Sequence, residues 1–215
     1  MPLPSPGTMM PPAPPGRQRE PRPKGAPAQI DQIQGTAMTD LNPTTTIRIL
    51  TTGGTIEKSY CEAEGTLKNR ASIIRDGLIA ALRLPYTRLE LESVLNKDSL
   101  EMDDGDRRQI ADAIARTAEQ GEPIVVLHGT DTMSDTADYC FGKLGTPAVP
   151  VVFTGAMKPM GFIDSDARQN VIEALLAARL MPPGFYIAFH NRVLPIPGAR
   201  KNRETGTFEA VAAKP

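Results

Sequence analysis

Short apolar runs alternate with stretches of helical periodicity between residues 46 and 189, and this alternation constrains the fold more than any other feature of the sequence. The run at 123–127 is apolar throughout, which is typical of a strand buried on both faces of a sheet. Between Asp103 and Gly121, apolar residues such as Ile110 and Ile114 recur at helical spacing. The repeated order of strand, helix and strand predicts right-handed crossovers and a parallel sheet.

The same pattern gives each predicted element a position. We expect strands at 47–52, 89–92, 123–127, 149–153 and 185–189. We expect helices from about residue 72 to the proline at 85, from 103–104 to 121, and at 134–144 and 165–180. The predicted architecture is a single α/β domain with a doubly wound, mostly parallel sheet and helices on both faces, as in Rossmann-like and flavodoxin-like folds.

The first 43 residues differ in composition from the rest, because they hold 11 of the 21 prolines. A segment of this kind buries too little apolar surface to offset its ordering entropy. We therefore expect a disordered, Pro-rich extension at 1–44, one catalytic domain at 45–210 and a short tail at 211–215.

Composition narrows the possible partners. The 24 basic and 25 acidic residues give a net charge of −1, which attracts neither nucleic acid nor an anionic membrane, so we expect a small-molecule substrate. Cys61 and Cys140 cannot form a disulfide framework, and His128 and His190 lack metal-ligand spacing, so no metal site or cofactor is expected. Without a membrane-length apolar run or a signal peptide, we expect a cytoplasmic protein.

Ligands of doubly wound sheets bind beyond the carboxyl ends of the strands, so the loops at 51–55, 128–133 and 154–159 are where chemistry is expected. The first, TTGGT, lacks the third glycine of a dinucleotide-binding loop and the Gly-Lys-Ser/Thr of a phosphate-binding loop. The second, HGTDTM, opens a helix, so its polar side chains fit capping as well as catalysis. The third, TGAMKP, fits a plain turn. None of the three motifs is decisive alone.

Together, TGGTI and HGTDTM resemble the two signatures of the bacterial L-asparaginase family. The similarity continues through NKDSLEM at 96–102, TGAMKP, SDARQN at 165–170 and GARKNRETGTF at 198–208. It covers nearly all of residues 47–208 and keeps the family's order of motifs. The short spacing between Thr55 and Tyr60, and the end of the sequence soon after the RKN segment, resemble the short, single-domain branch of the family.

The resemblance implies specific site residues. The catalytic residues it implies are Thr55, Tyr60, Thr130, Asp131 and Lys201. The substrate contacts it implies are Gly54, Ser99 and Gly129, together with Thr130 and Asp131. It also implies a homo-oligomer, either a dimer or a tetramer. The polar loop at 57–66 contains Gly65 and is expected to form a lid over the site.

The chemistry of these residues agrees with the resemblance, because a threonine hydroxyl is a weak nucleophile that requires a nearby base. We expect an L-asparaginase that converts L-asparagine to L-aspartate and ammonia through an acyl-enzyme on Thr55, although attack by Thr130 stays open. A glutaminase-asparaginase of broader specificity is one alternative, since one methylene is only weakly discriminated. A tRNA-dependent amidotransferase component and a non-catalytic amino-acid sensor are others; a sensor would tolerate loss of Thr55 or Lys201, and both residues are present.

Overall fold

The computed structural model of the chain describes residues 43–61, 65–69 and 73–211. Its strands are β1 (Thr45–Thr51), β2 (Lys58–Cys61), β3 (Thr66–Asn69), β4 (Thr87–Ser93), β5 (Ile124–Leu127), β6 (Pro150–Thr154), β7 (Gly184–Phe189), β8 (Arg192–Pro195), β9 (Ala199–Asn202) and β10 (Thr207–Ala210). Its helices are α1 (Asp104–Ala118), α2 (Met133–Leu144) and α3 (Ala167–Leu180). Shorter helical turns are η1 (Thr55–Glu57), η2 (Ile73–Leu78), η3 (Ile79–Ala81) and η4 (Ser99–Glu101). Almost all of the predicted 1–44 extension and of the 211–215 tail lies outside the described residues.

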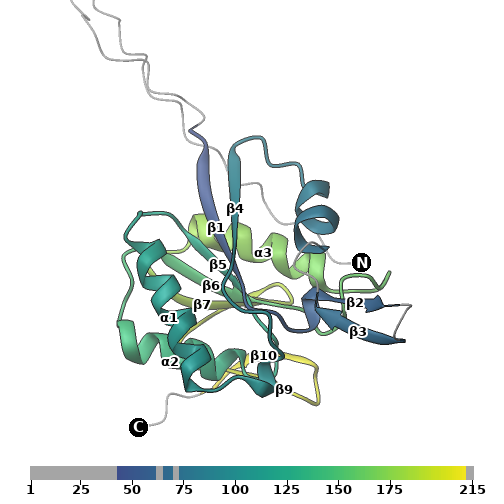
Figure 1. Cartoon of the computed structure of the whole chain (residues 1–215). Helices are drawn as coiled ribbons and strands as arrows, with labels where there is room; N and C mark the ends of the chain where they lie inside the picture. The colour runs from purple at the N-terminus through teal and green to yellow at the C-terminus, as the bar shows by residue number, and fades with distance from the viewer. Residues whose placement is uncertain (1–42, 62–64, 70–72, 212–215) are drawn as a thin grey trace, which may run out of the picture. The chain divides into compact units, whose positions relative to one another are not determined.

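The central sheet has the strand order β4-β1-β5-β6-β7-β8 (Figure 1). All neighbouring pairs are parallel except β7 and β8, which form an antiparallel hairpin at one edge. The chain passes from β1 to β4 on one side and then returns to β5 on the other side of β1. The prediction of a doubly wound, mostly parallel sheet is therefore confirmed, with the change of direction located at β1.

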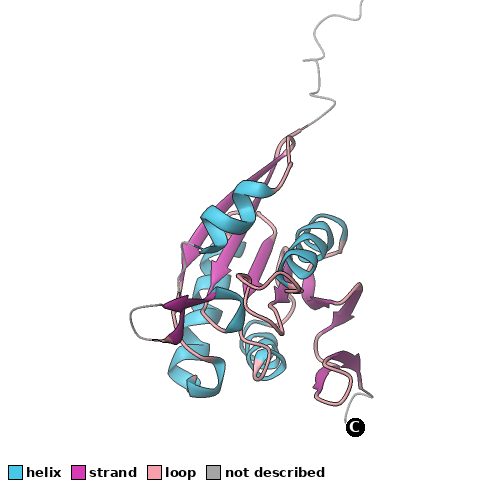
Figure 2. Cartoon of the chain, turned by 90° about the vertical axis from the view of Figure 1, so that its right-hand side faces the viewer, coloured by secondary structure: helices cyan, strands magenta, loops and turns pink. Residues whose placement is uncertain are grey.

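Two apolar cores lie on the two faces of this sheet. One contains Ile110 and Ile114 of α1 with Met133 and Cys140 of α2. The other contains buried residues of α3, such as Val171, together with η2. The quarter-turn view in Figure 2 shows helices on both sides of the strands, as predicted. Among the described residues, no helix combines the length and the apolar character needed to cross a bilayer.

The predicted strands of the central sheet and the helices α1, α2 and α3 are observed within about three residues of their expected ends. Helix α1 begins where predicted, because Asp103 and Asp106 form a reciprocal capping box. The helix predicted from residue 72 is instead a π-helical turn followed by a 3-10 turn that ends at Ala81. Gly77 within this segment and Pro85 beyond it disfavour a regular α-helix.

The pairs β2–β3 and β9–β10 were not predicted. Each pair consists of two antiparallel strands of four residues. Strands this short give no clear alternation in the sequence, so their pairing depends on tertiary contacts.

Candidate active site

Three loops leave the sheet at the same level. Thr51 at the end of β1 pairs with Leu127 at the end of β5, and Leu127 pairs with Thr154 at the end of β6. The loops that follow these three strands are the predicted TGGTI, HGTDTM and TGAMKP segments. They therefore meet beside the strand at which the sheet changes direction, where ligands bind in this class of fold.

Glycines allow these loops to touch backbone to backbone. A Cβ atom added at Gly54 would lie 2.5 Å from Gly129 Cα, and one added at Gly155 would lie 2.3 Å from the His128 carbonyl oxygen. A Cβ at Gly129 would lie 2.4 Å from Ser99 Oγ. No side chain fits at such separations, so each glycine is required by the close approach of the neighbouring segment.

Lys201 completes a polar cluster with the second loop. Its Nζ donates hydrogen bonds to Thr130 Oγ1 at 2.8 Å and to Asp131 Oδ1 at 3.0 Å. The Arg203 guanidinium also lies 3.1 Å from Asp131 Oδ1. Thr130 is buried and the Lys201 side chain is only 16% exposed, so the contact between them is largely shielded from water, whereas the Arg203 side chain is mostly exposed. The structure thus brings together Thr130, Asp131 and Lys201, three of the predicted catalytic residues.

Thr132 and Ser99 join the second loop to the segment after β4. The Thr132 hydroxyl donates to the Ser99 carbonyl oxygen at 2.8 Å, and Ser99 is buried against Gly129. Thr132 occupies the N-cap position of α2 but makes no side-chain capping bond, so the capping interpretation is wrong for this residue. Ser99 and Gly129 lie in contact, as their predicted common role in substrate binding requires.

The two loops touch at Gly54 and Gly129. Thr55 directly follows the first of these glycines and Thr130 directly follows the second. Gly54 has φ 88° and precedes the single turn η1 that Thr55 opens. The backbone of Thr55 therefore lies near that of Thr130, but among the described residues no contact between the Thr55 side chain and Lys201 is recorded.

Tyr60 is not brought to Thr55 by any hydrogen bond recorded in the described part of the chain. Its side chain is 62% exposed on β2, and its hydroxyl is the nearest atom to a Cβ built at Gly65, at 3.9 Å. Tyr60 pairs across the hairpin with Leu67. The predicted lid is therefore in part a two-stranded hairpin, although residues 62–64 lie outside the description.

A family model described as "Asparaginase, N-terminal" matches residues 46–215. The chain belongs to the asparaginase family. This membership confirms the family predicted from the TGGTI and HGTDTM signatures.

Several curated proteins and solved structures are similar to much of the chain. An L-asparaginase of Thermococcus kodakarensis is 32% identical over 149 residues, which covers 68% of this chain and 44% of that protein. A component of the glutamyl-tRNA(Gln) amidotransferase of Methanococcus maripaludis is 33% identical over 147 residues, covering 67% and 34%. The solved thermostable L-asparaginase from Thermococcus kodakarensis matches with a TM-score of 0.72 and 29% identity, covering 79% and 52%. The chain thus spans less than half the length of both sequence relatives.

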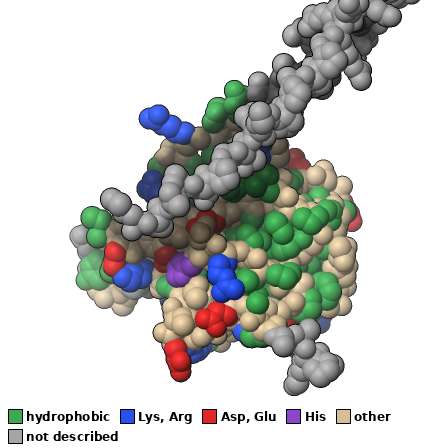
Figure 3. Space-filling view, turned by 180° about the vertical axis from the view of Figure 1, so that it is seen from behind, with side chains coloured by type: hydrophobic (Ala, Val, Ile, Leu, Met, Phe, Trp, Pro, Cys, Tyr) green, Lys and Arg blue, Asp and Glu red, His purple; other side chains and the backbone are tan. Residues whose placement is uncertain are grey.

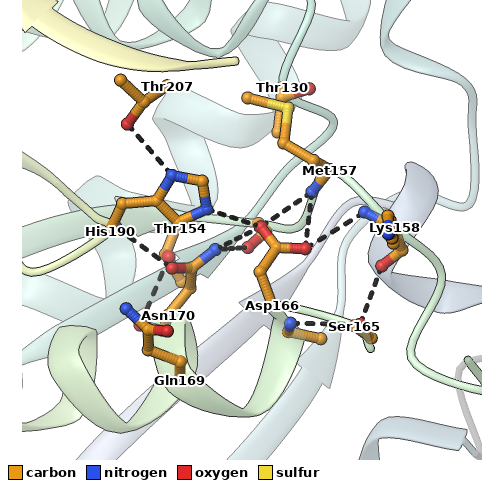
Figure 4. A network of polar contacts seen from close by, with 12 residues as sticks. Thr130, Thr154, Met157, Lys158, Ser165, Asp166, Gln169, Asn170, His190 and Thr207 are labelled. Carbon is orange, nitrogen blue, oxygen red and sulfur yellow. Dashed lines mark hydrogen bonds and ion pairs between the residues drawn. The ribbon is translucent and has the colours of Figure 1, made fainter. Parts of the chain in front are cut away.

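A polar network around Asp166, which the sequence did not reveal, holds the TGAMKP loop (Figure 4). The Asp166 carboxylate accepts hydrogen bonds from the Met157 and Lys158 N–H groups and from the Asn170 side-chain amide. The fully buried Asn170 also donates to the Gly155 carbonyl oxygen. The N-terminus of α3 thereby fixes the TGAMKP loop.

His190 belongs to the same network. Its two ring nitrogens lie 3.1 Å from Asp166 Oδ2 and 3.1 Å from Thr207 Oγ1, and its backbone N–H donates to Asn170. Both ring nitrogens of His190 therefore have a polar partner. His190 and Asn191 have φ values of 47° and 60°, a left-handed backbone that favours asparagine and glycine in the two-residue turn between β7 and β8.

A cavity of about 400 Å³ adjoins the Lys201 cluster. Its charged lining side chains are Lys158, Asp164, Asp166, His190, Lys201 and Arg203. Figure 3 shows a histidine on the molecular surface with basic and acidic side chains gathered around it. Lys201 therefore faces a solvent-accessible space as well as Thr130.

Proposed function

We propose that the chain hydrolyses the side-chain amide of L-asparagine to L-aspartate and ammonia by means of a threonine nucleophile. The observation that carries this proposal is the contact of Lys201 Nζ with both Thr130 Oγ1 and Asp131 Oδ1, one residue away from the point where the Gly54 and Gly129 loops touch. A weak hydroxyl nucleophile requires a base within hydrogen-bond reach, and this cluster supplies one. The family and the relative from Thermococcus kodakarensis support the same reaction class.

The proposed reaction has two stages. In the first, the Thr55 oxygen forms a bond to the amide carbon, its proton passes to the leaving nitrogen, and the carbon–nitrogen bond breaks to release ammonia. In the second, water forms a bond to the same carbon and the ester bond to Thr55 breaks, which returns the proton to the threonine oxygen. Lys201 acts as the base in its neutral form and passes protons by way of Thr130 in both stages, while Asp131 orients the amino group and stabilises the ammonium formed when it accepts a proton.

The alternative attacker is Thr130, and one observation favours it. Its hydroxyl already has a nitrogen base at 2.8 Å, whereas the predicted partner of Thr55, Tyr60, lies exposed on the hairpin. We propose that Tyr60 relays a proton from Thr55 during the reaction. Attack by Thr55 is preferred here because Lys201 and Thr130 then remain available as a shared base.

Substrate recognition is proposed to use the opposite oxygen of Asp131. The contacts recorded for Asp131 among the described residues, from Lys201 and Arg203, go to Oδ1. Oδ2 is therefore proposed to accept the substrate ammonium group, with Ser99 and the backbone of Gly54 and Gly129 around the α-carboxylate.

The proposal also covers the location, the assembly and the partners of the whole protein. A cytoplasmic location, a homo-oligomer and the absence of a cofactor or nucleic-acid partner are proposed together with the activity. A relative named as part of an amidotransferase motivates comparison of asparagine with glutamine, because both amides release ammonia.

The test is ammonia release from L-asparagine and L-glutamine by the purified full chain, with Thr55→Val as the matched variant. Release from asparagine that is lost in the variant supports the proposal. Equal rates with both amides indicate a glutaminase-asparaginase. Amino-acid binding without ammonia release from either amide indicates a sensor and contradicts the proposal.

A further inference from the structure

Glu57 is a fully buried carboxyl group inside the threonine loop. It closes the η1 turn, two residues after Thr55. The expectation of a polar lid from residue 57 onward is wrong for this residue, because its side chain points into the protein rather than to solvent. The proposed reaction assigns it no role.

Hydrogen bonds between Glu57 and the backbone of Gly53 and Gly54 close a short turn that contains Thr55. Its Oε1 accepts a hydrogen bond from the Gly53 N–H at 3.1 Å, and its own N–H donates to the Gly54 carbonyl oxygen at 3.1 Å. The Lys58 N–H donates to the Thr55 carbonyl oxygen. These three hydrogen bonds hold residues 53–58 in one compact turn that contains Thr55.

The turn at Gly53 and Gly54 requires such a restraint. Their φ values are 95° and 88°, a backbone region in which glycine has little intrinsic preference between alternatives. Gly53 is itself buried, so its N–H would lose its partner if the carboxyl group were removed. A buried N–H without an acceptor costs about 1–3 kcal/mol, which is enough to favour a different turn.

Burial of this carboxyl group costs free energy, so its presence in the core requires a structural reason. Glu57 Oε2 and the neighbouring Thr51 Oγ1 are both buried without a hydrogen-bond partner among the described residues. Burial raises the pKa of Glu57 to about 7, while the Gly53 N–H and the nearby Thr51 hydroxyl act in the opposite direction. An apolar side chain would avoid this cost, but it would leave the Gly53 N–H unsatisfied.

We propose that Glu57 is a positioning residue for the nucleophile loop: its side-chain oxygen holds the Gly53–Gly54 turn so that the Thr55 hydroxyl is presented beside the Gly129–Thr130 loop. This inference rests on the proposed amide hydrolysis. Glu57 acts through the backbone of Gly53 rather than on the substrate, so its contribution is to kcat more than to KM. A displacement of about 1 Å at a reacting group lowers rates by about 100-fold.

The experiment compares three variants of the full chain. Glu57→Gln keeps an oxygen that accepts from Gly53 and should retain kcat for asparagine within a few-fold. Glu57→Met has the same length but no acceptor and should lower kcat about 10–100-fold with KM little changed. Ile114→Ala, in the core of α1, should lower the melting temperature without changing kcat.

A second measurement separates this inference from the proposed function. Hydrogen exchange of the peptide spanning residues 53–58 should be faster in Glu57→Met than in the wild type, Glu57→Gln and Ile114→Ala. If Glu57→Met does not fold, Glu57→Asp, whose shorter chain does not reach Gly53, takes its place. Unchanged exchange, or unchanged kcat in an active enzyme, overturns the inference. If exchange at residues 53–58 is faster in Glu57→Met than in the wild type, but the wild type releases no ammonia, the hydrolytic function is refuted. The restraint of the Gly53–Gly54 turn by Glu57 is then still supported.

Discussion

Lys201 Nζ lies 2.8 Å from Thr130 Oγ1, although the two residues are 71 positions apart in the sequence. The β9–β10 hairpin carries the lysine, and the loop after β5 carries the threonine. Neither segment is catalytically informative alone, because a lysine on a short strand and a threonine before a helix are both common. Their contact places an amino group beside a hydroxyl group, which is the pair that the proposed reaction requires.

Replacement of Lys201 should therefore remove the base without unfolding the protein. We expect Lys201→Met to lower kcat for asparagine hydrolysis by about 10²–10⁴-fold, the range for loss of a general base. Steady-state ammonia release checks this, with circular dichroism as the test of folding. Lys143→Met is the matched control, because Lys143 pairs with Asp112 at the surface, and its activity should be unchanged. Full activity in Lys201→Met would remove Lys201 from the mechanism.

The identity of the attacking threonine should be visible as a covalent adduct. If Thr55 attacks, acid quenching during turnover should trap an aspartyl ester on the peptide that contains residue 55. Mass spectrometry of a proteolytic digest locates it. The adduct should form more slowly in Thr130→Val but stay on the same peptide. An adduct on the peptide containing residue 130 would reverse the assignment of the two threonines.

Close backbone contact predicts that Gly129→Ala disrupts the site. The new Cβ would lie 2.4 Å from Ser99 Oγ and 2.6 Å from Ser99 Cβ, so the two loops must separate. We expect a loss of about 1–3 kcal/mol in the free energy of unfolding, typical of overpacking, together with loss of activity.

The matched control is Gly142→Ala in helix α2, where nothing lies within 4 Å of the added atom. Because alanine is the better helix former, this variant should gain about 0.8–1 kcal/mol. Urea unfolding measures both changes, and equal effects at the two glycines would contradict the observed packing.

Burial of Glu57 predicts a pH dependence of stability. The unfolded chain releases this proton near the ordinary pKa of 4.5, whereas the folded protein keeps it until about 7. The folded state therefore binds more protons between these values, and the contribution of Glu57 to stability falls as pH rises through this window. A difference of one pKa unit is about 1.4 kcal/mol, so the loss is about 3 kcal/mol by pH 8.

Urea unfolding of the wild type and Glu57→Gln at pH 4 and pH 8 checks this prediction. Groups common to both proteins cancel in the comparison, including Asp98 and Asp106, whose pKa values are lowered by hydrogen bonds from Lys58 and Lys97. The wild type should lose stability relative to Glu57→Gln on going to pH 8. A relative gain would show that the carboxyl group is not desolvated.

The sequence motifs predicted the residues of the candidate site more accurately than the apolar pattern predicted the short strands around it. Thr130, Asp131 and Lys201 were predicted together and lie together. Tyr60 was predicted beside Thr55, yet its side chain lies exposed on the β2–β3 hairpin. The sequence spacing of five residues is compatible with either placement, because a two-stranded hairpin is too weak a local pattern to fix where its side chains point.

The sequence by itself determined the alternation of the main strands and helices, the two faces of the sheet and the loops in which the candidate site residues lie. These follow from apolar periodicity and from motifs that are contiguous in the chain. Only the tertiary structure decided which groups touch: Lys201 with Thr130, Asp166 with the Met157 N–H, and the buried Glu57 carboxyl group with the Gly53 N–H. Such contacts join segments that are distant or turn sharply, so burial and backbone geometry, rather than local propensity, determine them.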